Sequence, residues 1–238
     1  MRGLFLDFEA SDKDVKTARI TQLALSIFDL NEARELFHYS TLVKPDGDYE
    51  INETAAKITG ITKEQLEIYG VPVAEALSAL LFRFSSVDFL IAHNLHNYDL
   101  PLLKNECERA KIRFFHPELI DTRFDIPWPE HIETRKLTYL GAEHGVVNHS
   151  AHSARFDTDL MAKLFFMYPL DEIIKRSKSP RFWVRANVSY DNKDKAKDKK
   201  FAWDSKNKIW VKQFKECDLA KETFDFQITR MNPEYQGP

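Results

Sequence analysis

Cysteine is scarce in this 238-residue chain, which has only Cys107 and Cys217 and no Cys-x-x-Cys pair. Two isolated cysteines cannot form a disulfide framework, so we expect reduced thiols of the kind common in the cytosol. Glycine and proline are also few, at 7 and 10 residues, which argues against a collagen-like or linker-dominated architecture. By contrast, 18 Phe, 8 Tyr and 4 Trp supply the large apolar side chains of a folded core and argue against disorder.

Long apolar runs are lacking as well. The N-terminus offers Leu4, Phe5 and Leu6 before Asp7, which is too short for the apolar region of a secretory signal peptide. No other stretch approaches the roughly 20 apolar residues that a membrane span needs. We therefore expect a soluble, cytoplasmic protein without a membrane partner.

The charge of the chain is small but unevenly distributed. The formal net charge is −3, which by itself gives little attraction to a polyanion. Residues 175–215 contain 14 lysines and arginines against four aspartates, a net charge of +10, so the rest of the chain carries −13. The sequence therefore combines an acidic body with a basic segment near its C-terminus.

Apolar periodicity predicts an α/β domain with a mixed sheet over most of the chain. A nearly continuous apolar run at residues 3–9 is typical of a strand buried on both faces. Further strands are expected at 19–29, 36–44, 88–93, 112–115 and 119–121, and helices within 51–69 and at 72–84, 97–111, 134–145 and 153–168.

The pattern changes after Ser179-Pro180. A strand is expected at 182–190 and a hairpin at 201–214, joined by a lysine-rich linker at 191–200. We therefore expect two domains, an α/β domain at residues 1–178 and a small β-rich module at residues 179–238.

Acidic residues occupy positions where core residues belong. Asp7 and Glu9 are two apart in the first strand, so both point to the same face, roughly 7 Å apart along the strand. Asp99 and Asp157 each precede, by three and four residues, the apolar stripe of an expected helix. A buried carboxylate is costly unless a cation or hydrogen bonds compensate it. The alternatives are an edge strand with a solvated face and acids that favour a helix N-terminus.

Four inward-facing acids can converge on divalent cations if their elements are neighbours. Carboxylate oxygens are hard ligands that suit Mg²⁺ or Mn²⁺, and two such ions can stabilise the attacking and leaving oxygens of a phosphodiester. His152 lies five residues before Asp157, just outside the expected helix. A neutral imidazole there can accept a proton from an attacking water, whereas the alternative is a hydrogen-bonded loop histidine.

Three ordered motifs resemble those of the DEDDh 3′–5′ exonucleases, the DnaQ-like branch of the RNase H-like superfamily, and are most similar to exonuclease X and RNase T-like members. The first is Asp7-Phe8-Glu9, the second is AHNLHNYDLPLL with Asp99 as its acid, and the third is HSARFD at 152–157. INETAAKITGIT and Ile120-Asp121-Thr122 are also similar to family segments. The resemblance covers residues 1–168 and implies an RNase H-like, mixed five-stranded sheet flanked by helices.

The resemblance also implies an activity: metal-dependent hydrolysis at 3′ ends of DNA or RNA, with release of nucleoside 5′-monophosphates and two Mg²⁺ or Mn²⁺ ions as cofactors. It implies that Asp7, Glu9 and Asp157 bind one ion, that Asp7 and Asp99 bind the other, and that His152 is the general base.

The same motifs imply contacts with the nucleic acid. The residues concerned are Phe8, Ala10, His93 and Asn94. The chain departs from the family after the first motif, because Ala10-Ser11-Asp12 stands where Thr-Thr-Gly is usual. This departure concerns the contacts near the terminal nucleotide and leaves the metal ligands in place.

The basic segment combines lysines with aromatic residues, and both types can bind nucleic acid. We expect its lysines to contact phosphates, whereas we expect Trp203 and Trp210 to be buried in an ordinary β core. The lysines are Lys193, Lys195, Lys197, Lys199 and Lys200.

Two other functions compete with the exonuclease. A zinc hydrolase could use the pairs His93/His96 and His149/His152, although their spacing suits one helix face poorly and leaves Asp7 and Glu9 unexplained. A non-catalytic nucleic-acid-binding protein could use the same fold. The motifs do not distinguish DNA from RNA and leave the oligomeric state open.

Overall fold

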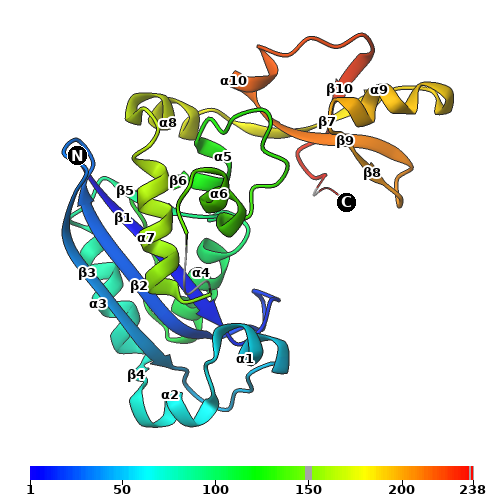
Figure 1. Cartoon of the computed structure of the whole chain (residues 1–238). Helices are drawn as coiled ribbons and strands as arrows, with labels where there is room; N and C mark the ends of the chain where they lie inside the picture. The colour runs from blue at the N-terminus through cyan, green and yellow to red at the C-terminus, as the bar shows by residue number, and fades with distance from the viewer. Residues whose placement is uncertain (148–151, 236, 238) are drawn as a thin grey trace. The chain divides into compact units, whose positions relative to one another are not determined.

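The computed structural model describes residues 1–147, 152–235 and 237. The chain divides into two compact units, Met1–Ile174 and Lys175–Pro238. Each unit has its own sheet and its own hydrophobic core (Figure 1). In the described ranges, no helix combines the length and the apolar character that a bilayer crossing needs.

The first unit is built on a mixed sheet with the order β4-β3-β2-β1-β5-β6. β1 pairs antiparallel with β2 and parallel with β5, β2 and β3 are antiparallel, and β6 continues the parallel side. The strands are β1 (Arg2–Ala10), β2 (Ile20–Asp29), β3 (Arg34–Lys44), β4 (Val71–Pro72), β5 (Phe89–Ala92) and β6 (Glu118–Asp121).

The predicted α/β fold with a mixed sheet is confirmed, with one strand more than the five that the family resemblance implies. The extra strand is β4, whose Val71 and Pro72 pair with Val43 and Lys44 of β3. Proline is tolerated there because β4 is an edge strand and has no outer neighbour to which it must donate. The strand predicted at 112–115 is wrong, since these residues form no regular element.

Eight helices of the described chain belong to or border on the first unit. A capping box of Thr62 and Gln65 starts α2, and Gly60 ends α1 with a φ of 71°. The helices are α1 (Glu53–Thr59), α2 (Lys63–Tyr69), α3 (Val73–Phe84), α4 (Asp99–Arg109), α5 (Thr122–Asp125), α6 (Leu137–Glu143), α7 (Ala154–Phe165) and α8 (Leu170–Ser177).

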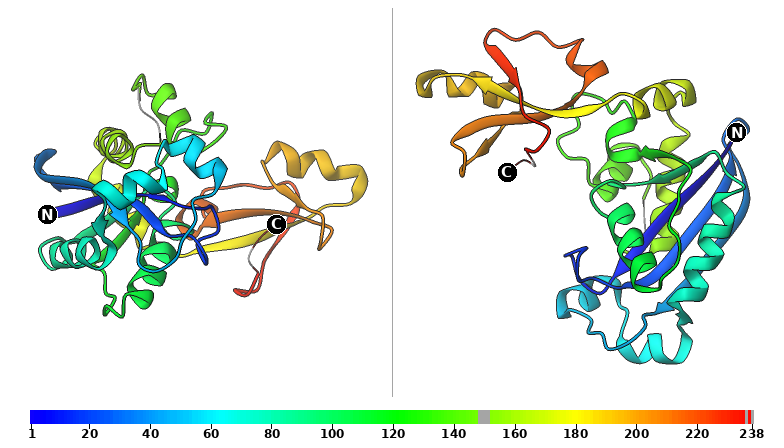
Figure 2. Two further views of the ribbon diagram at one scale, coloured as in Figure 1. Left: turned by 90° about the horizontal axis from the view of Figure 1, so that it is seen from below. Right: turned by 180° about the vertical axis from the view of Figure 1, so that it is seen from behind.

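Strand β1 separates two cores through the alternation of its side chains. Leu4, Leu6 and Phe8 pack with the apolar faces of α3 and α4, whereas Phe5 packs with Phe165 of α7 on the opposite face. Figures 1 and 2 show α3 and α7 on opposite sides of the sheet. Because side chains alternate with a period of two, Asp7 and Glu9 share the α7 face with Phe5.

The second unit has an antiparallel sheet with the order β10-β7-β9-β8. The predicted hairpin is present, with β8 paired to β9. The lysine-rich linker is instead largely helical, because Ala196 anchors one turn of helix in the core beside Phe201 and Phe214. The elements are β7 (Arg181–Asn187), the 3-10 helix Tyr190–Asn192, α9 (Lys193–Asp198), β8 (Ala202–Asp204), β9 (Ile209–Lys215), α10 (Glu216–Leu219) and β10 (Gln227–Arg230).

The prediction that Trp203 is buried is wrong. Trp203 is 47% exposed, because β8 is the edge strand of this sheet and no further described strand pairs with it. Trp210, on the neighbouring strand, is partly buried.

Candidate active site

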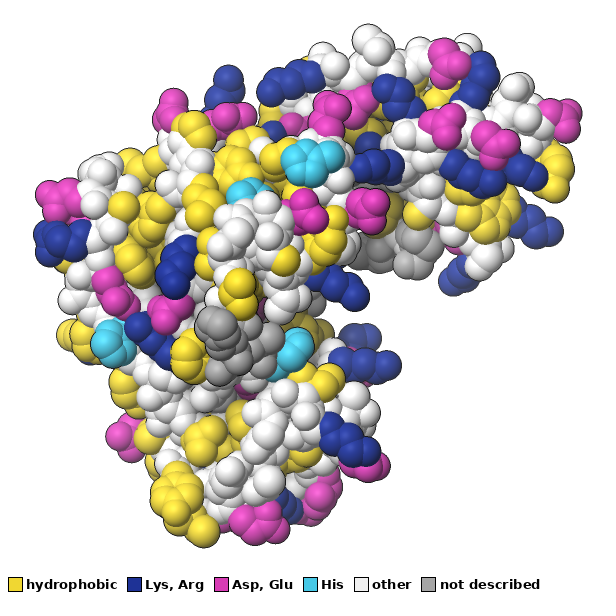
Figure 3. Space-filling model, in the orientation of Figure 1, with side chains coloured by type: hydrophobic (Ala, Val, Ile, Leu, Met, Phe, Trp, Pro, Cys, Tyr) yellow, Lys and Arg dark blue, Asp and Glu magenta, His cyan; other side chains and the backbone are white. Residues whose placement is uncertain are grey.

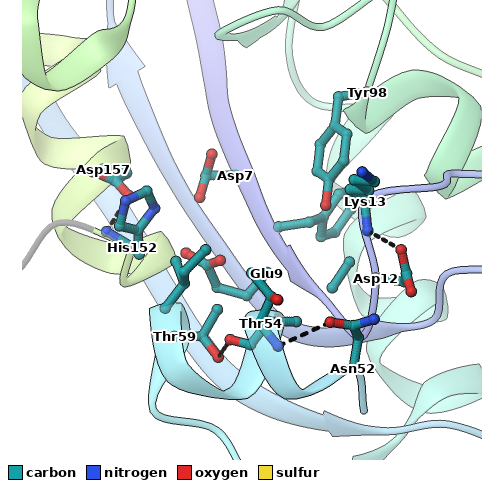
Figure 4. Close-up of a pocket in the computed structure, with 14 residues that line it drawn as sticks. Asp7, Glu9, Asp12, Lys13, Asn52, Thr54, Thr59, Tyr98, His152 and Asp157 are labelled. Atoms are coloured by element: carbon teal, nitrogen blue, oxygen red, sulfur yellow. Dashed lines mark hydrogen bonds between the residues drawn. The ribbon is translucent and has the colours of Figure 1, made fainter. Parts of the chain in front are cut away.

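Three predicted acids come together where β1 faces α7. Asp7 and Glu9 project from β1 and Asp157 from the first turn of α7 (Figure 4). One carboxylate oxygen from each lies within 4.8 Å of the other two. This spacing allows a single divalent cation to be bound by all three residues.

Asp99, at the N-terminus of α4, lies close to this cluster, since its charge acts on Asp7. Its side chain is 2% exposed, and Oδ1 accepts no hydrogen bond from any residue that the structure describes. A backbone hydrogen bond from Phe8 of β1 reaches the same carboxyl group. A buried carboxylate oxygen without a donor is costly, so the position suits a bound cation.

Electrostatic repulsion links the four acids. Burial, and then the charges of Asp99, Glu9 and Asp157, raise the pKa of Asp7 well above its ordinary range. Burial and the Asp121 charge do the same to the pKa of Asp99. Burial, followed by the charge of Asp157, raises the pKa of Glu9 from 4.5 to about 7. A divalent cation would relieve this repulsion, and the all-oxygen donor set fits Mg²⁺ or Mn²⁺.

Without metal, the protein should lose stability as the pH rises from about 4.5 to 7. Glu9 binds its proton more tightly in the folded state than in the unfolded state. Protonation of Glu9 therefore stabilises the fold at pH values below the unfolded-state pKa. This contribution is lost as the pH rises through the folded-state pKa. This pKa shift corresponds to roughly 3 kcal/mol in the free energy of unfolding. Urea denaturation in EDTA would measure it as the difference between wild type and Glu9→Gln. A difference that stays constant from pH 4.5 to 7 would contradict the assignment.

His152 lies beside the acids, just before α7. Its backbone N–H donates to Oδ2 of Asp157 at 3.0 Å, and its φ is 64°. Figure 4 places its ring next to Asp157 and near Glu9. The side chain is exposed, so the imidazole can contact a bound molecule.

Among the described residues, the His93/His96 pair of the zinc hypothesis belongs to no group of side chains that could hold a metal ion. His93 uses both ring nitrogens within the fold, with Nδ1 3.0 Å from Thr122 Oγ1 and Nε2 2.7 Å from the carbonyl oxygen of Arg135. Burial lowers the pKa of His93 to about 4. His149 lies outside the described residues.

Asp7, Glu9 and Asp157 line an open pocket of about 440 Å³, whereas Asp99 is not part of its lining. Of the predicted nucleic-acid contacts, Phe8 and Ala10 belong to its lining, whereas His93 and Asn94 do not. Sequence reasoning missed most of the remaining walls, which come from the loop after β1, the start and face of α1 and the residue before α4. These residues are Asp12, Lys13, Asn52, Thr54, Ala55, Ile58, Thr59 and Tyr98.

The fold leaves the α1 wall of the pocket only partly covered. All side chains of α1 are at least partly exposed, and Ile58 is 49% exposed. An apolar side chain that a short helix leaves uncovered is available to a ligand. Tyr98, next to Asp99, is also in the lining, and burial together with the Asp99 charge raises its pKa.

Asp121 fixes the loop that leads to Asp99. It is fully buried at the end of β6. Its carboxylate accepts backbone hydrogen bonds from Asn94 (2.9 Å), His96 (3.3 Å) and Arg123 (3.1 Å). These bonds hold Asn94 at a φ of 67° and thereby set where α4 begins.

The fold resembles that of E. coli exonuclease I. The zinc-bound complex of that enzyme with single-stranded DNA has a TM-score of 0.64 and 19% sequence identity, covering 78% of this chain and 48% of that chain. The complex with a dA16 oligonucleotide has a TM-score of 0.63 and 20% identity, with the same coverage. At this level of identity the similarity concerns the fold, and this chain spans about half the length of those structures.

A PolC-type DNA polymerase III of Mycoplasma genitalium is 29% identical over 127 residues, which make up 51% of this chain and 8% of the polymerase. Residues 182–231 match a family model described as a domain of unknown function, DUF8626. Residues 4–165, more than half of the chain, match the RNase_T family model, described as an exonuclease. This match confirms the family resemblance predicted from the motifs, and the chain belongs to the RNase_T family of exonucleases.

Proposed function

We propose that this chain is a metal-dependent 3′–5′ exonuclease that hydrolyses phosphodiester bonds at 3′ ends of DNA or RNA and releases nucleoside 5′-monophosphates. The observation that carries the proposal is the convergence of Asp7, Glu9 and Asp157 at one open pocket, with the buried Asp99 close enough for its charge to act on Asp7. Family membership supports it, as does a fold similar to that of exonuclease I.

The acids would hold two Mg²⁺ or Mn²⁺ ions. Asp7, Glu9 and Asp157 would bind one ion, and Asp7 and Asp99 would bind the second. Such ions supply Lewis-acid stabilisation of the charge that develops on the attacking and leaving oxygens. The unsatisfied Oδ1 of Asp99 and the raised pKa of Glu9 support this assignment.

His152 would accept the proton of the attacking water. The backbone N–H of His152 donates a hydrogen bond to Asp157, so the proposed general base and a proposed metal ligand are both positioned by the start of α7. Because the imidazole ring is exposed, it can accept the proton and release it to solvent, while the carboxylates stay ionised as metal ligands. Ala55 and Ile58 offer apolar surface to a base, and Asn52 and Tyr98 offer polar atoms beside it.

We assign the nuclease domain to residues 1–178 and an accessory module to residues 179–238. The division of the chain after Ile174 supports this boundary, as do separate family matches at 4–165 and 182–231.

The test is an end-labelled cleavage assay. The full chain is incubated with 5′-labelled DNA or RNA oligonucleotides in Mg²⁺, Mn²⁺, Zn²⁺ or EDTA. We expect a ladder that shortens from the 3′ end in Mg²⁺ or Mn²⁺ and no products in EDTA. Binding without cleavage in any metal would indicate the non-catalytic alternative, and activity in Zn²⁺ alone would indicate the zinc hydrolase.

A further inference from the structure

The C-terminal unit carries a row of aromatic rings and lysines that the nuclease site does not use. The row starts at Tyr190, where Lys193 Nζ lies 3.8 Å from the ring centroid. It continues through Lys197, whose Nζ is 6.0 Å from the centroid of Trp210, and ends at Trp203, whose ring centroid is 5.3 Å from that of Trp210. We call these five residues the aromatic strip.

The outer members of the strip are open to solvent. Tyr190 is 80% exposed and Trp203 is 47% exposed. Trp203 and Trp210 are directly opposite each other in the β8–β9 pairing, so Trp210 supports the inner side of the Trp203 ring, while the edge position of β8 leaves the outer side uncovered. The exposed faces of the Tyr190 and Trp203 rings are surfaces on which bases can stack.

The charge around the strip is positive. The unit Lys175–Pro238 contains 16 lysines and arginines and nine acids, a net charge of +7. Figure 3 shows lysine and arginine side chains next to hydrophobic ones over this unit. A polyanion is therefore attracted to it.

Ion pairs within the second unit reduce the number of predicted lysines that are available to bind a phosphate. Lys195 pairs with Asp225 at 2.7 Å and Lys199 with Glu222 at 3.4 Å. Lys197 pairs with Asp194, but both side chains are exposed, so a phosphate can compete for the ammonium.

Two further lysines, which the sequence analysis did not single out, lie in the turn between the two tryptophans. Lys206 and Lys208 are exposed, and among the described residues neither forms an ion pair. They place two cations beside the Trp203 end of the strip.

We propose that the aromatic strip binds single-stranded nucleic acid, with bases stacked on Tyr190 and Trp203 and phosphates beside Lys193, Lys206 and Lys208. Stacking needs unpaired bases, because the faces of bases in a duplex are covered by their neighbours. The inference rests on the proposed function for its class of ligand, but its site lies in the other unit and works without metal.

The experiment measures binding of the full chain to 5′-fluorescein-dT20 by fluorescence anisotropy in EDTA, which suppresses metal-dependent hydrolysis. We expect Tyr190→Ala/Trp203→Ala to weaken binding at least tenfold, since stacking on two rings is lost. Tyr69→Ala, which removes a ring that is 70% exposed on α2, is the matched control and should change binding less than twofold. An unchanged affinity of the double variant would overturn the proposal.

Further arms separate stacking from unfolding and from general charge. Trp203→Phe should restore most of the binding, because the ring face is retained. Lys206→Ala/Lys208→Ala should reduce the salt dependence of binding by about one to one and a half in the log–log slope. An equal loss of affinity for a dT20·dA20 duplex in the double aromatic variant would contradict base stacking.

Substituting rU20 for dT20 distinguishes RNA from DNA, and failure of both strands to bind would overturn the proposal. The outcome is independent of the nuclease assay. If the double aromatic variant binds as tightly as the wild type while the wild type shortens 3′ ends, only this inference is refuted. If the variant loses binding while the wild type shows no shortening, only the proposed activity is refuted.

Discussion

Asp7→Asn is expected to abolish 3′ shortening and to make the metal-free protein more stable. Asp7 is the acid that interacts with all three others, because the charges of Asp99, Glu9 and Asp157 each raise its pKa. A neutral amide removes a ligand of both proposed ions, and a loss of several kcal/mol of transition-state stabilisation corresponds to roughly 10³-fold or more in rate.

The gain in stability comes from the same repulsion. In EDTA the variant lacks one of four mutually repelling carboxylates, so its Tm should rise by about 2–4 °C for each kcal/mol of repulsion removed. Mn²⁺ should raise the Tm of the wild type and leave that of the variant nearly unchanged. Asp48→Asn, at a side chain that is 97% exposed, should behave like the wild type. A Tm that falls in EDTA would show that Asp7 stabilises the fold by some other interaction.

His152→Asn is expected to lower kcat by about 10²- to 10⁴-fold while leaving metal binding intact. Asparagine is chosen because it tolerates the left-handed backbone of this position, where φ is 64°. The variant keeps the backbone N–H that donates to Asp157, but its side-chain amide cannot accept the proton of the attacking water.

Single-turnover rates of the wild type and the variant test this role. The variant should be slower than the wild type by this factor, while its KM and its Mn²⁺-induced increase in Tm stay within about twofold of the wild type. His131→Asn, at a side chain that is 71% exposed, serves as the control. A variant that loses metal binding together with activity would make His152 a structural or ligand residue instead of a base.

The arrangement of the acids could be predicted because local rules determine it. Alternation along β1 places Asp7 and Glu9 on one face, and helical spacing turns Asp99 and Asp157 inward. Their actual convergence depends on long-range pairing, since β1 lies between β2 and β5, and α7 packs on the face that Phe5 shares with them.

The parts that could not be predicted depend on distant partners. Tyr98 and Asn52 reach the pocket because α1 and the start of α4 are brought to the same strand end, which no local spacing encodes. The exposure of Trp203 follows from the edge position of β8, and the pairing of Lys195 with Asp225 joins residues 30 apart. Local periodicity carries no information about such contacts.

The central claim is that Asp7, Glu9, Asp99 and Asp157 form one divalent-metal site. Anomalous diffraction from crystals of the full chain grown with Mn²⁺ tests it most directly, because the scattering locates the ion without any assumption about activity. We expect peaks within direct coordination distance of the carboxylate oxygens of Asp7, Glu9 and Asp157 and of Asp7 and Asp99, and none there in Asp7→Asn. A map without a peak at these carboxylates, at Mn²⁺ concentrations that support 3′ shortening, would contradict the claim.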